Sequence, residues 1–337
     1  MKSKLLKIKA LKNSIKIKNL KLRIIGYLIL EIGLLVLFPQ KIFAENLSVG
    51  IYPPILQIQT DPPASVKAGI SIQNKSDQTI TYNIYLIPFR SSVKNNGEPN
   101  FDKELLSEYK NFFDNIQVWD NDHSIKQVKL APQEKKNLTL HLGIQKNEKP
   151  QDYYFSVVFI TEPMDQTSKT SALGNQAGIG TNVLVSIGPK GPATGNISEF
   201  SAPELATKGP VSFKLGLTNT GKSFFSAKGN IAIKNMFGQT IGQIELVPSN
   251  VLAKSTRFIA SKDSNNPEEP RVVWNEKFLL GFYTAEATAA LSDEGPIVRK
   301  KIHFLAFPIE LLLGILVALA IVIGIIRRVK AKEKEIS

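Results

Sequence analysis

Apolar and polar side chains alternate with a period of two along most of the region between residues 45 and 303. Such alternation is typical of β-strands with one face on a core and the other in solvent. Short segments rich in Asn, Ser, Asp and Gly separate the alternating runs and predict turns. The runs include residues 70–73, 81–87, 138–142 and 231–234, and the turns include 74–77, 219–221 and 235–238. This pattern predicts a mainly β protein built from antiparallel sandwiches.

Three segments depart from the alternation. Residues 101–113 carry apolar side chains at spacings near about 3.6 and predict a helix. Pro53 and Pro54 interrupt a strand-like run. Because proline cannot donate to a sheet ladder, we expect this strand at a sheet edge or at a switch between two sheets. Residues 162–180 are polar and rich in Ser, Thr, Gly and Gln, which predicts a long loop.

A loose internal duplication indicates two modules. Residues 68–76 and 213–221 each form an alternating run that ends in an Asn-containing turn. Each module has a later strand built on an aromatic pair, Tyr153-Tyr154 in the first and Phe282-Tyr283 in the second. The sequence Gly-Pro-Lys-Gly-Pro at residues 188–192 has the composition of a linker. We therefore expect two immunoglobulin-like β-sandwich domains in tandem, at 45–188 and 196–303, joined by a linker at 189–195.

The C-terminal region carries a long apolar segment. Residues 304–326 are apolar apart from Pro308 and Glu310, and five Lys or Arg residues follow between positions 327 and 334. A helix of this length spans a bilayer. Since basic residues stay on the cytoplasmic side, the segment predicts a transmembrane helix at 304–326, a basic cytoplasmic tail at 327–337 and an extracytoplasmic location for everything before them.

The N-terminal region has a matching arrangement. Nine basic residues between Lys2 and Arg23 precede an apolar run at 24–38 that is interrupted by Glu31. Ala44 then offers a small residue for cleavage. Residues 1–44 are thus expected to be a signal peptide or an uncleaved signal anchor. The expected location is the cytoplasmic membrane, with a single pass through the C-terminal helix once the signal peptide is cleaved, or with a second anchor if it is retained. Both alternatives place residues 45–303 outside.

The charge distribution changes the meaning of the basic composition. The formal net charge is +13, of which residues 1–44 carry +9 and residues 327–337 carry +3. Residues 45–326 are left with +1, so the excess of basic residues reports membrane topology and no nucleic-acid partner is expected. The chain also has no cysteine, which excludes disulfides and requires a fold held by its hydrophobic cores.

Residues 216–223 match the phosphate-binding pattern G-x-x-x-x-G-K-S. Phosphate binding there would need a helix directly after Ser223, because the helix N-terminus supplies the amides. A strand-like run follows instead, so we expect a hairpin turn with Gly221 at positive φ and no nucleotide.

Other catalytic patterns are also missing. The three histidines, His123, His141 and His303, lie outside metal-ligand spacing of one another, and no G-x-S-x-G motif occurs. No catalytic, cofactor-binding or metal-binding residue is expected, and the protein is predicted not to be an enzyme. An exported hydrolase stays open as an alternative, because two carboxylates can converge from distant strands. The C-terminal segment has no Leu-Pro-x-Thr-Gly sorting motif, which favours retention in the membrane.

The order of these features resembles the WxL-interacting proteins of bacterial cell surfaces. It comprises a Pro-rich first strand, an Asn-Lys-Ser turn, the sequence Val-Lys-Leu-Ala-Pro at 128–132, a Tyr-Tyr strand, a second sandwich and a single anchor with a basic tail. The resemblance implies a first domain that binds peptidoglycan and a second that contacts a surface protein.

The function predicted from the sequence is therefore binding on the extracytoplasmic side of the membrane. Its expected partners are the cell wall, a surface protein or both, together with the lipid bilayer around the C-terminal helix. A scaffold or accessory subunit of a membrane complex is the alternative. Candidate ligand contacts are the aromatic pairs Tyr153, Tyr154, Phe282 and Tyr283.

Overall fold

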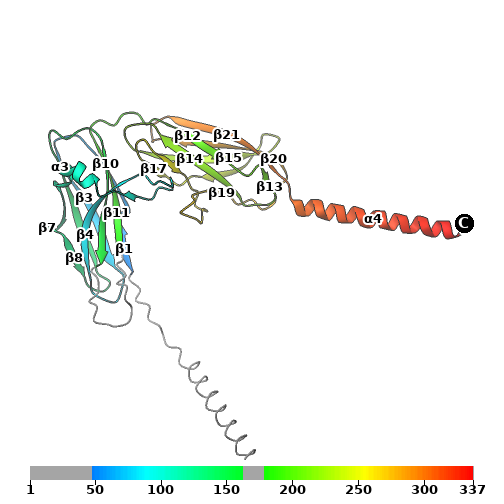
Figure 1. Cartoon of the computed structure of the whole chain (residues 1–337), viewed down its shortest axis with the longest axis horizontal. Coiled ribbons are helices and arrows are strands. Elements are labelled where there is room, and N and C mark those ends of the chain that lie inside the picture. Colours follow the sequence, from blue (N-terminus) through cyan, green and yellow to red (C-terminus); the bar gives the residue numbers. More distant parts are fainter. Residues whose placement is uncertain (1–47, 162–177, 337) are drawn as a thin grey trace, which may run out of the picture. The chain divides into compact units, whose positions relative to one another are not determined.

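The computed structural model describes residues 48–161 and 178–336, which form two β-sandwiches followed by one long helix (Figure 1). The prediction of a mainly β chain with two immunoglobulin-like sandwiches and a C-terminal helix is confirmed. The signal segment predicted at 1–44 lies outside the described residues.

The first sandwich packs two sheets around one core. The first sheet has the strand order β1-β3-β9-β6-β7, and the second has the order β2-β11-β10-β4-β5 with β8 also paired to β4. The strands are β1 (Val49–Tyr52), β2 (Ile55–Thr60), β3 (Ala64–Asn74), β4 (Ile80–Arg90), β5 (Asn100–Phe101), β6 (Ile116–Asp120), β7 (His123–Ile125), β8 (Gln127–Leu130), β9 (Lys135–Ile144), β10 (Asp152–Thr161) and β11 (Gly178–Ile187).

The proline pair lies where the chain changes sheets. Strand β1, which ends at Tyr52, is at the edge of the first sheet, and β2, which begins at Ile55, is at the edge of the second. Pro53 and Pro54 fall between them, where no ladder hydrogen bond from a backbone N–H is needed. The structure confirms both parts of this expectation, the edge position and the switch.

The second sandwich is built in the same way. One sheet has the order β12-β14-β18 with β19 also paired to β14, and the other has the order β13-β21-β20-β15-β16 with β17 paired to β15. The strands are β12 (Gly195–Ser201), β13 (Leu205–Ala206), β14 (Val211–Asn219), β15 (Phe225–Lys234), β16 (Thr240–Glu245), β17 (Ser249–Val251), β18 (Thr256–Phe258), β19 (Val272–Trp274), β20 (Gly281–Ala290) and β21 (Ile297–Ala306).

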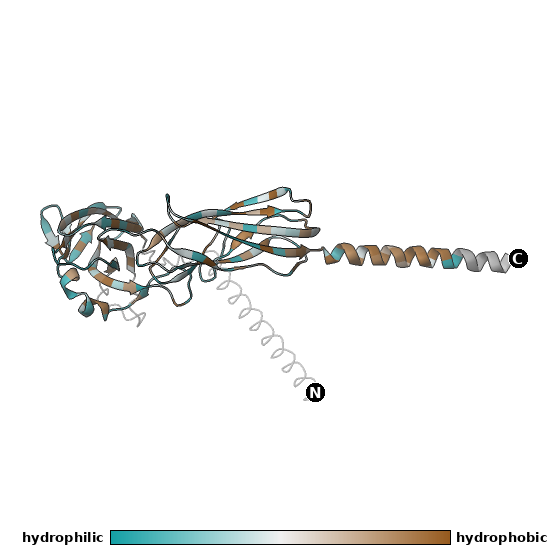
Figure 2. Cartoon of the chain, turned by 90° about the horizontal axis from the view of Figure 1, so that it is seen from above, coloured by the Kyte–Doolittle hydropathy of each residue, from teal (hydrophilic) through white to brown (hydrophobic). Residues whose placement is uncertain are grey.

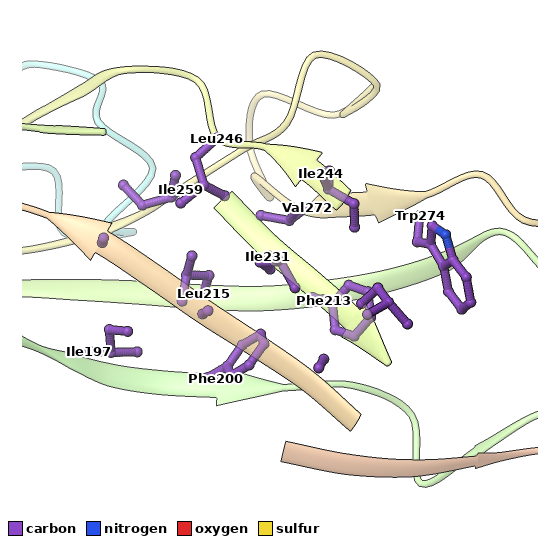
Figure 3. Packing of buried hydrophobic residues seen from close by; sticks show 14 of the residues in the cluster. Ile197, Phe200, Phe213, Leu215, Ile231, Ile244, Leu246, Ile259, Val272 and Trp274 are labelled. Carbon is purple, nitrogen blue, oxygen red and sulfur yellow. The ribbon is translucent and has the colours of Figure 1, made fainter. Parts of the chain in front are cut away.

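Each sandwich encloses its own hydrophobic core. Figure 3 shows part of the second core, where Phe213, Leu215 and Ile231 are fully buried between the two sheets. The first core contains Phe155 and Phe159, which have no exposed surface. In both cores the buried positions alternate with outward-facing ones along the strands, as the sequence pattern predicts.

A buried asparagine occupies the same place in both sandwiches. Asn74 ends β3, and its Nδ2 donates to the carbonyl oxygens of Gln78 at 2.7 Å and Ala131 at 3.0 Å. Asn219 ends β14, and its Nδ2 donates to the carbonyl oxygens of Ser223 at 2.9 Å and Val251 at 3.0 Å. The duplicated turn sequence therefore corresponds to a duplicated hydrogen-bonding arrangement.

The helix expected at 101–113 is wrong in extent. The structure has two short helices there, α2 (Leu105–Glu108) and α3 (Lys110–Phe113), separated by Tyr109 at φ −108°. Phe101 belongs to β5, where it pairs with β4. The break reorients the chain so that Phe112 and Phe113 enter the first core, and packing against that core overrides a continuous helix.

The C-terminal helix α4 (Ile309–Ile336) contains a segment, Ile309–Arg328, that is long and apolar enough to cross a membrane. Figure 2 shows the hydrophobic residues of this segment in brown along the helix. The span was expected to begin at residue 304, but β21 continues to Ala306. Pairing of β21 with β20 keeps these residues in the sheet. Similarly, Gly178 and Gly180 of the loop expected at 162–180 belong to β11, and residues 162–177 lie outside the described part.

Candidate ligand-binding surfaces

The outward face of the sheet formed by β1, β3, β9, β6 and β7 is polar and open. On β9 and β3, the outward positions alternate with the core positions, and the side chains there belong to Lys67, Ser71, Asn137 and Thr139. Gly69 lies among them, and a Cβ placed on it would meet no atom within 4 Å. This face therefore offers amide, hydroxyl and ammonium groups to solvent.

Two rings lie together on this face. Trp119 of β6 stacks on His141 of β9, with ring centroids 4.5 Å apart and an interplanar angle of 7°. The strand pairing places Gln117 opposite His141, and the Trp119 Nε1–H donates to Gln117 Oε1 at 3.0 Å. Burial and the nearby Lys67 ammonium lower the pKa of His141, so its ring is neutral near pH 7.

The stacked pair has the chemistry of a saccharide platform. A planar indole ring can pack against the C–H face of a pyranose, while neighbouring amides and hydroxyls exchange hydrogen bonds with its hydroxyl groups. Both kinds of group are present here, because Gln117 and Asn137 are exposed beside the half-buried Trp119. No functional role was expected from the sequence for either His141 or Trp119. Alternation does place both on outward positions, but their contact depends on the β6–β9 register.

Two of the four predicted contact residues are buried. Tyr153 is 2% exposed and stacks on Phe112 with ring centroids 3.9 Å apart. Burial and its hydrogen bond to Glu148 raise its pKa above the usual range. Tyr283 is 8% exposed, and its hydroxyl bonds to the backbone of Leu280. In both aromatic pairs the inward ring is a core residue and contributes no binding surface.

The other two predicted contacts have different surroundings. Phe282 is 64% exposed at the start of β20. Tyr154 lies between the two sandwiches, where its ring stacks on Phe89 and meets Phe224 edge-on. Its hydroxyl accepts a hydrogen bond from the Ala253 N–H at 3.2 Å. Tyr154 is thus a contact residue, but its partner is the second sandwich of the same chain.

Asp152 connects the sandwiches beside Tyr154. Its Oδ2 accepts hydrogen bonds from the Phe224 N–H and the Tyr154 hydroxyl, each at 2.6 Å. Its Oδ1 accepts one from the Ser186 hydroxyl. Burial and the Asp152 carboxylate raise the pKa of Tyr154, which keeps its phenol a hydrogen-bond donor. A carboxylate that accepts three hydrogen bonds orders both sides of the junction.

A loop of the first sandwich provides a second connection. The Asn95 carbonyl oxygen accepts a hydrogen bond from the Phe258 N–H of β18 at 2.6 Å, and Lys94 forms an ion pair with Glu268. The Arg257 guanidinium packs on Gly97, which adopts φ +88°. Burial lowers the pKa of Arg257, and among the described residues no acidic side chain pairs with it. These contacts link the loop at residues 94–97 to the second sandwich.

The segment that matches a phosphate-binding motif has a structural role. Strand β15 follows it directly, as expected, and no helix N-terminus is present. Two details were wrong: β14 and β15 belong to different sheets, so the turn is no hairpin, and Gly221 is not among the glycines at positive φ. A glycine fits there because a Cβ would come within 2.9 Å of the Thr194 hydroxyl. Within the described residues, no group of three or more His, Asp and Glu could hold a metal ion.

No protein-family model and no curated protein matches this chain. Solved structures with a similar fold include the class 5 fimbriae chaperone CfaA, at 14% identity and TM-score 0.36, with 77% of this chain and 100% of that chain covered. The CsuC–CsuE chaperone–tip adhesion subunit complex of Acinetobacter baumannii matches at 12% identity and TM-score 0.35, covering 63% and 90%. The E. coli chaperone DraB matches at 10% and 0.34, covering 76% and 99%. Likeness at this level says nothing about ligand or partner.

Proposed function

We propose that this chain is a membrane-anchored binding protein that displays two immunoglobulin-like modules on the extracytoplasmic side of the cytoplasmic membrane. The apolar helix α4 and the basic residues at its C-terminal end support the anchor and its orientation. The resemblance to the WxL-interacting proteins supports attachment to the cell wall by the first module and to a surface protein by the second.

The observation that carries the binding function is the Trp119–His141 stack on an open polar sheet face. Glycan strands of the cell wall are polymers of sugar rings, and a half-buried indole flanked by exposed amides suits them. The sandwich junction supports this role, because Asp152 and Tyr154 tie the first module to the second. One anchored chain would then present both binding surfaces together, so that two weak contacts reinforce each other.

The test is co-sedimentation of the full chain in detergent with purified cell wall. Trp119→Ala removes the platform and should lower the affinity about tenfold, which corresponds to the loss of one aromatic stacking contact. The matched control is Tyr85→Ala, since Tyr85 is an exposed aromatic residue, 48% exposed, on the other sheet of the same sandwich. Equal binding by the Trp119→Ala variant and wild type would refute the assignment of the binding surface to the Trp119–His141 stack. Failure of the wild-type protein to bind would refute the proposed attachment to the cell wall.

Attachment of a surface protein needs its own measurement. In the described part of the chain, strand β12 is the edge of its sheet and pairs with β14 alone. The Lys300 ammonium donates to the Ile197 and Ser198 carbonyl oxygens of this edge, so strand addition by a partner would have to displace that ammonium. Crosslinking of intact cells followed by purification should recover one specific partner. If it recovers subunits of a membrane complex instead, the accessory-subunit alternative replaces surface-protein attachment.

A further inference from the structure

Exposed apolar side chains gather at one end of the second sandwich. The described residues outside α4 include 14 large apolar side chains that are exposed, and seven of these lie within or beside three neighbouring segments. Phe237 is 79% exposed and Phe278 is 62% exposed, which is unusual for phenylalanine in a soluble region. The set, called the apolar end below, is Leu205, Met236, Phe237, Ile241, Phe278, Leu280 and Phe282.

The strand pairing brings these positions together. Leu205 of β13 pairs with Leu305 of β21, and Phe282 of β20 pairs with the same residue from the other side. The turn that carries Met236 and Phe237 joins β15 to β16, and Lys234 at its start pairs with β20 only two residues beyond Phe282. A Cβ on Gly281 would come within 3.7 Å of the Met236 sulfur.

The same end of the sandwich leads directly into the C-terminal helix. Strand β21 ends at Ala306, and the Phe307 N–H still donates to the Ala206 carbonyl oxygen at 2.9 Å. Helix α4 begins at Ile309, so a chain of at most about 7 Å links the last sheet hydrogen bond to the helix. The apolar end therefore lies beside the start of α4.

The length of the apolar part of α4 determines how close the apolar end lies to the hydrocarbon core of the bilayer. Apart from Glu310 in its first turn, α4 is apolar from Ile309 to Ile326 before Arg327, and at about 1.5 Å per residue this part is about 27 Å long. The hydrocarbon core of a bilayer is about 30 Å thick, so this segment crosses it with no residue to spare. Ile309 must then lie at the outer boundary of the hydrocarbon, and the residues just before it must lie among the lipid headgroups.

We propose that the apolar end of the second sandwich inserts into the outer leaflet beside the helix and makes a second, shallow contact with the bilayer. The apolar side chains would be buried at the boundary of headgroups and acyl chains. The three segments that carry the apolar end are 203–210, 235–241 and 275–282. They contain two acidic residues, Glu204 and Glu276, and two basic residues, Lys208 and Lys277, so their formal net charge is zero. The contact is therefore hydrophobic and does not require acidic lipids.

This inference rests on the proposed membrane anchoring, and the experiment separates the two. The chain has no cysteine, so single-cysteine variants of the full chain can carry a nitroxide label at one chosen position. The labelled proteins are placed in nanodiscs of phosphatidylcholine, and collision of the nitroxide with oxygen and with a water-soluble nickel chelate is measured. Phe237→Cys reports the apolar end, and Val317→Cys reports the middle of α4. Glu294→Cys reports an exposed position between β20 and β21 at the opposite end of the sandwich.

We expect the nickel chelate to reach the nitroxide at position 237 about fivefold less than the nitroxide at position 294. The oxygen accessibility at position 237 should lie between the values at positions 294 and 317. Both results are those of a site about 5–10 Å deep in the membrane interface. Phe278→Cys should behave like Phe237→Cys, which guards against a local effect of one substitution. If positions 237 and 278 are as open to nickel as 294 while 317 is protected, the insertion is refuted and the anchor stands. If position 317 is open to nickel, the anchor itself is wrong and the insertion with it.

Discussion

Asp152→Ala should weaken the contact between the two sandwiches and lower the free energy of unfolding. In the wild-type protein this carboxylate accepts hydrogen bonds from the Phe224 N–H, the Tyr154 hydroxyl and the Ser186 hydroxyl. Hydrogen bonds to charged groups contribute about 1.5–3 kcal/mol each, and a buried donor left without a partner costs about 1–3 kcal/mol. Hydroxyl donors can rotate toward other acceptors, but the backbone N–H cannot. We therefore expect a loss of about 3 kcal/mol in the free energy of unfolding.

The loss can be measured in two ways. Thermal unfolding of the full chain in detergent should show a melting temperature lower by about 6–12 °C, given about 2–4 °C per kcal/mol for a body of this size. Hydrogen exchange should report the site directly, because the Phe224 amide loses its acceptor. If the amide exchanges through opening of the junction, its protection should fall about 100-fold for the same free energy.

Asp152→Asn is the matched control. It keeps an oxygen for the Phe224 N–H and places its own NH₂ near the Ser186 hydroxyl, which can turn to accept. Its expected cost is about 1 kcal/mol. If Asp152→Ala changes stability by less than about 0.5 kcal/mol, or if Phe224 keeps its protection, the carboxylate does not hold the junction and the argument is wrong.

Three further predictions test the structure at separate places. Asn74→Asp should cost about 3 kcal/mol at neutral pH, because a carboxylate cannot donate to the carbonyl oxygens around it. Its folded pKa should be raised above the unfolded value of about 3.9, so in urea titrations part of the stability should return as the pH falls through the folded pKa, and the return should be complete near about pH 4. Gly229→Ala should cost about 1–3 kcal/mol in the same assay, since its Cβ would lie 2.0 Å from a carbonyl oxygen of β20, whereas Gly69→Ala should be neutral or stabilising. The NMR titration midpoint of His141 should lie below 6.5, and a midpoint at or above that value would contradict the burial of its ring.

Local patterns predicted the strands and the C-terminal helix well. The alternating runs at residues 70–73 and 231–234 lie in β3 and β15, and the proline pair lies at the change of sheet. Predictions failed where tertiary contacts override a local signal. The apolar spacing at 101–113 predicted one helix. The structure has two short helices there, because Phe112 and Phe113 pack into the first core. Of each aromatic pair, the sequence could not say which ring is buried, because that depends on the face that meets the core.

The sequence by itself determined the fold class of the protein. A period of two predicted the strands, the length of an apolar run predicted the C-terminal helix, and the position of the charges showed that the region between the two basic ends is nearly neutral. Only the tertiary structure decided which distant residues meet. Trp119 and His141 stack because β6 pairs with β9 in one register, and Asp152 reaches Phe224 because the sandwiches pack together. The apolar end likewise combines segments from residue 205 to residue 282. Pairing of this kind is non-local, since it depends on which strands become neighbours, and a local pattern carries no information about neighbours.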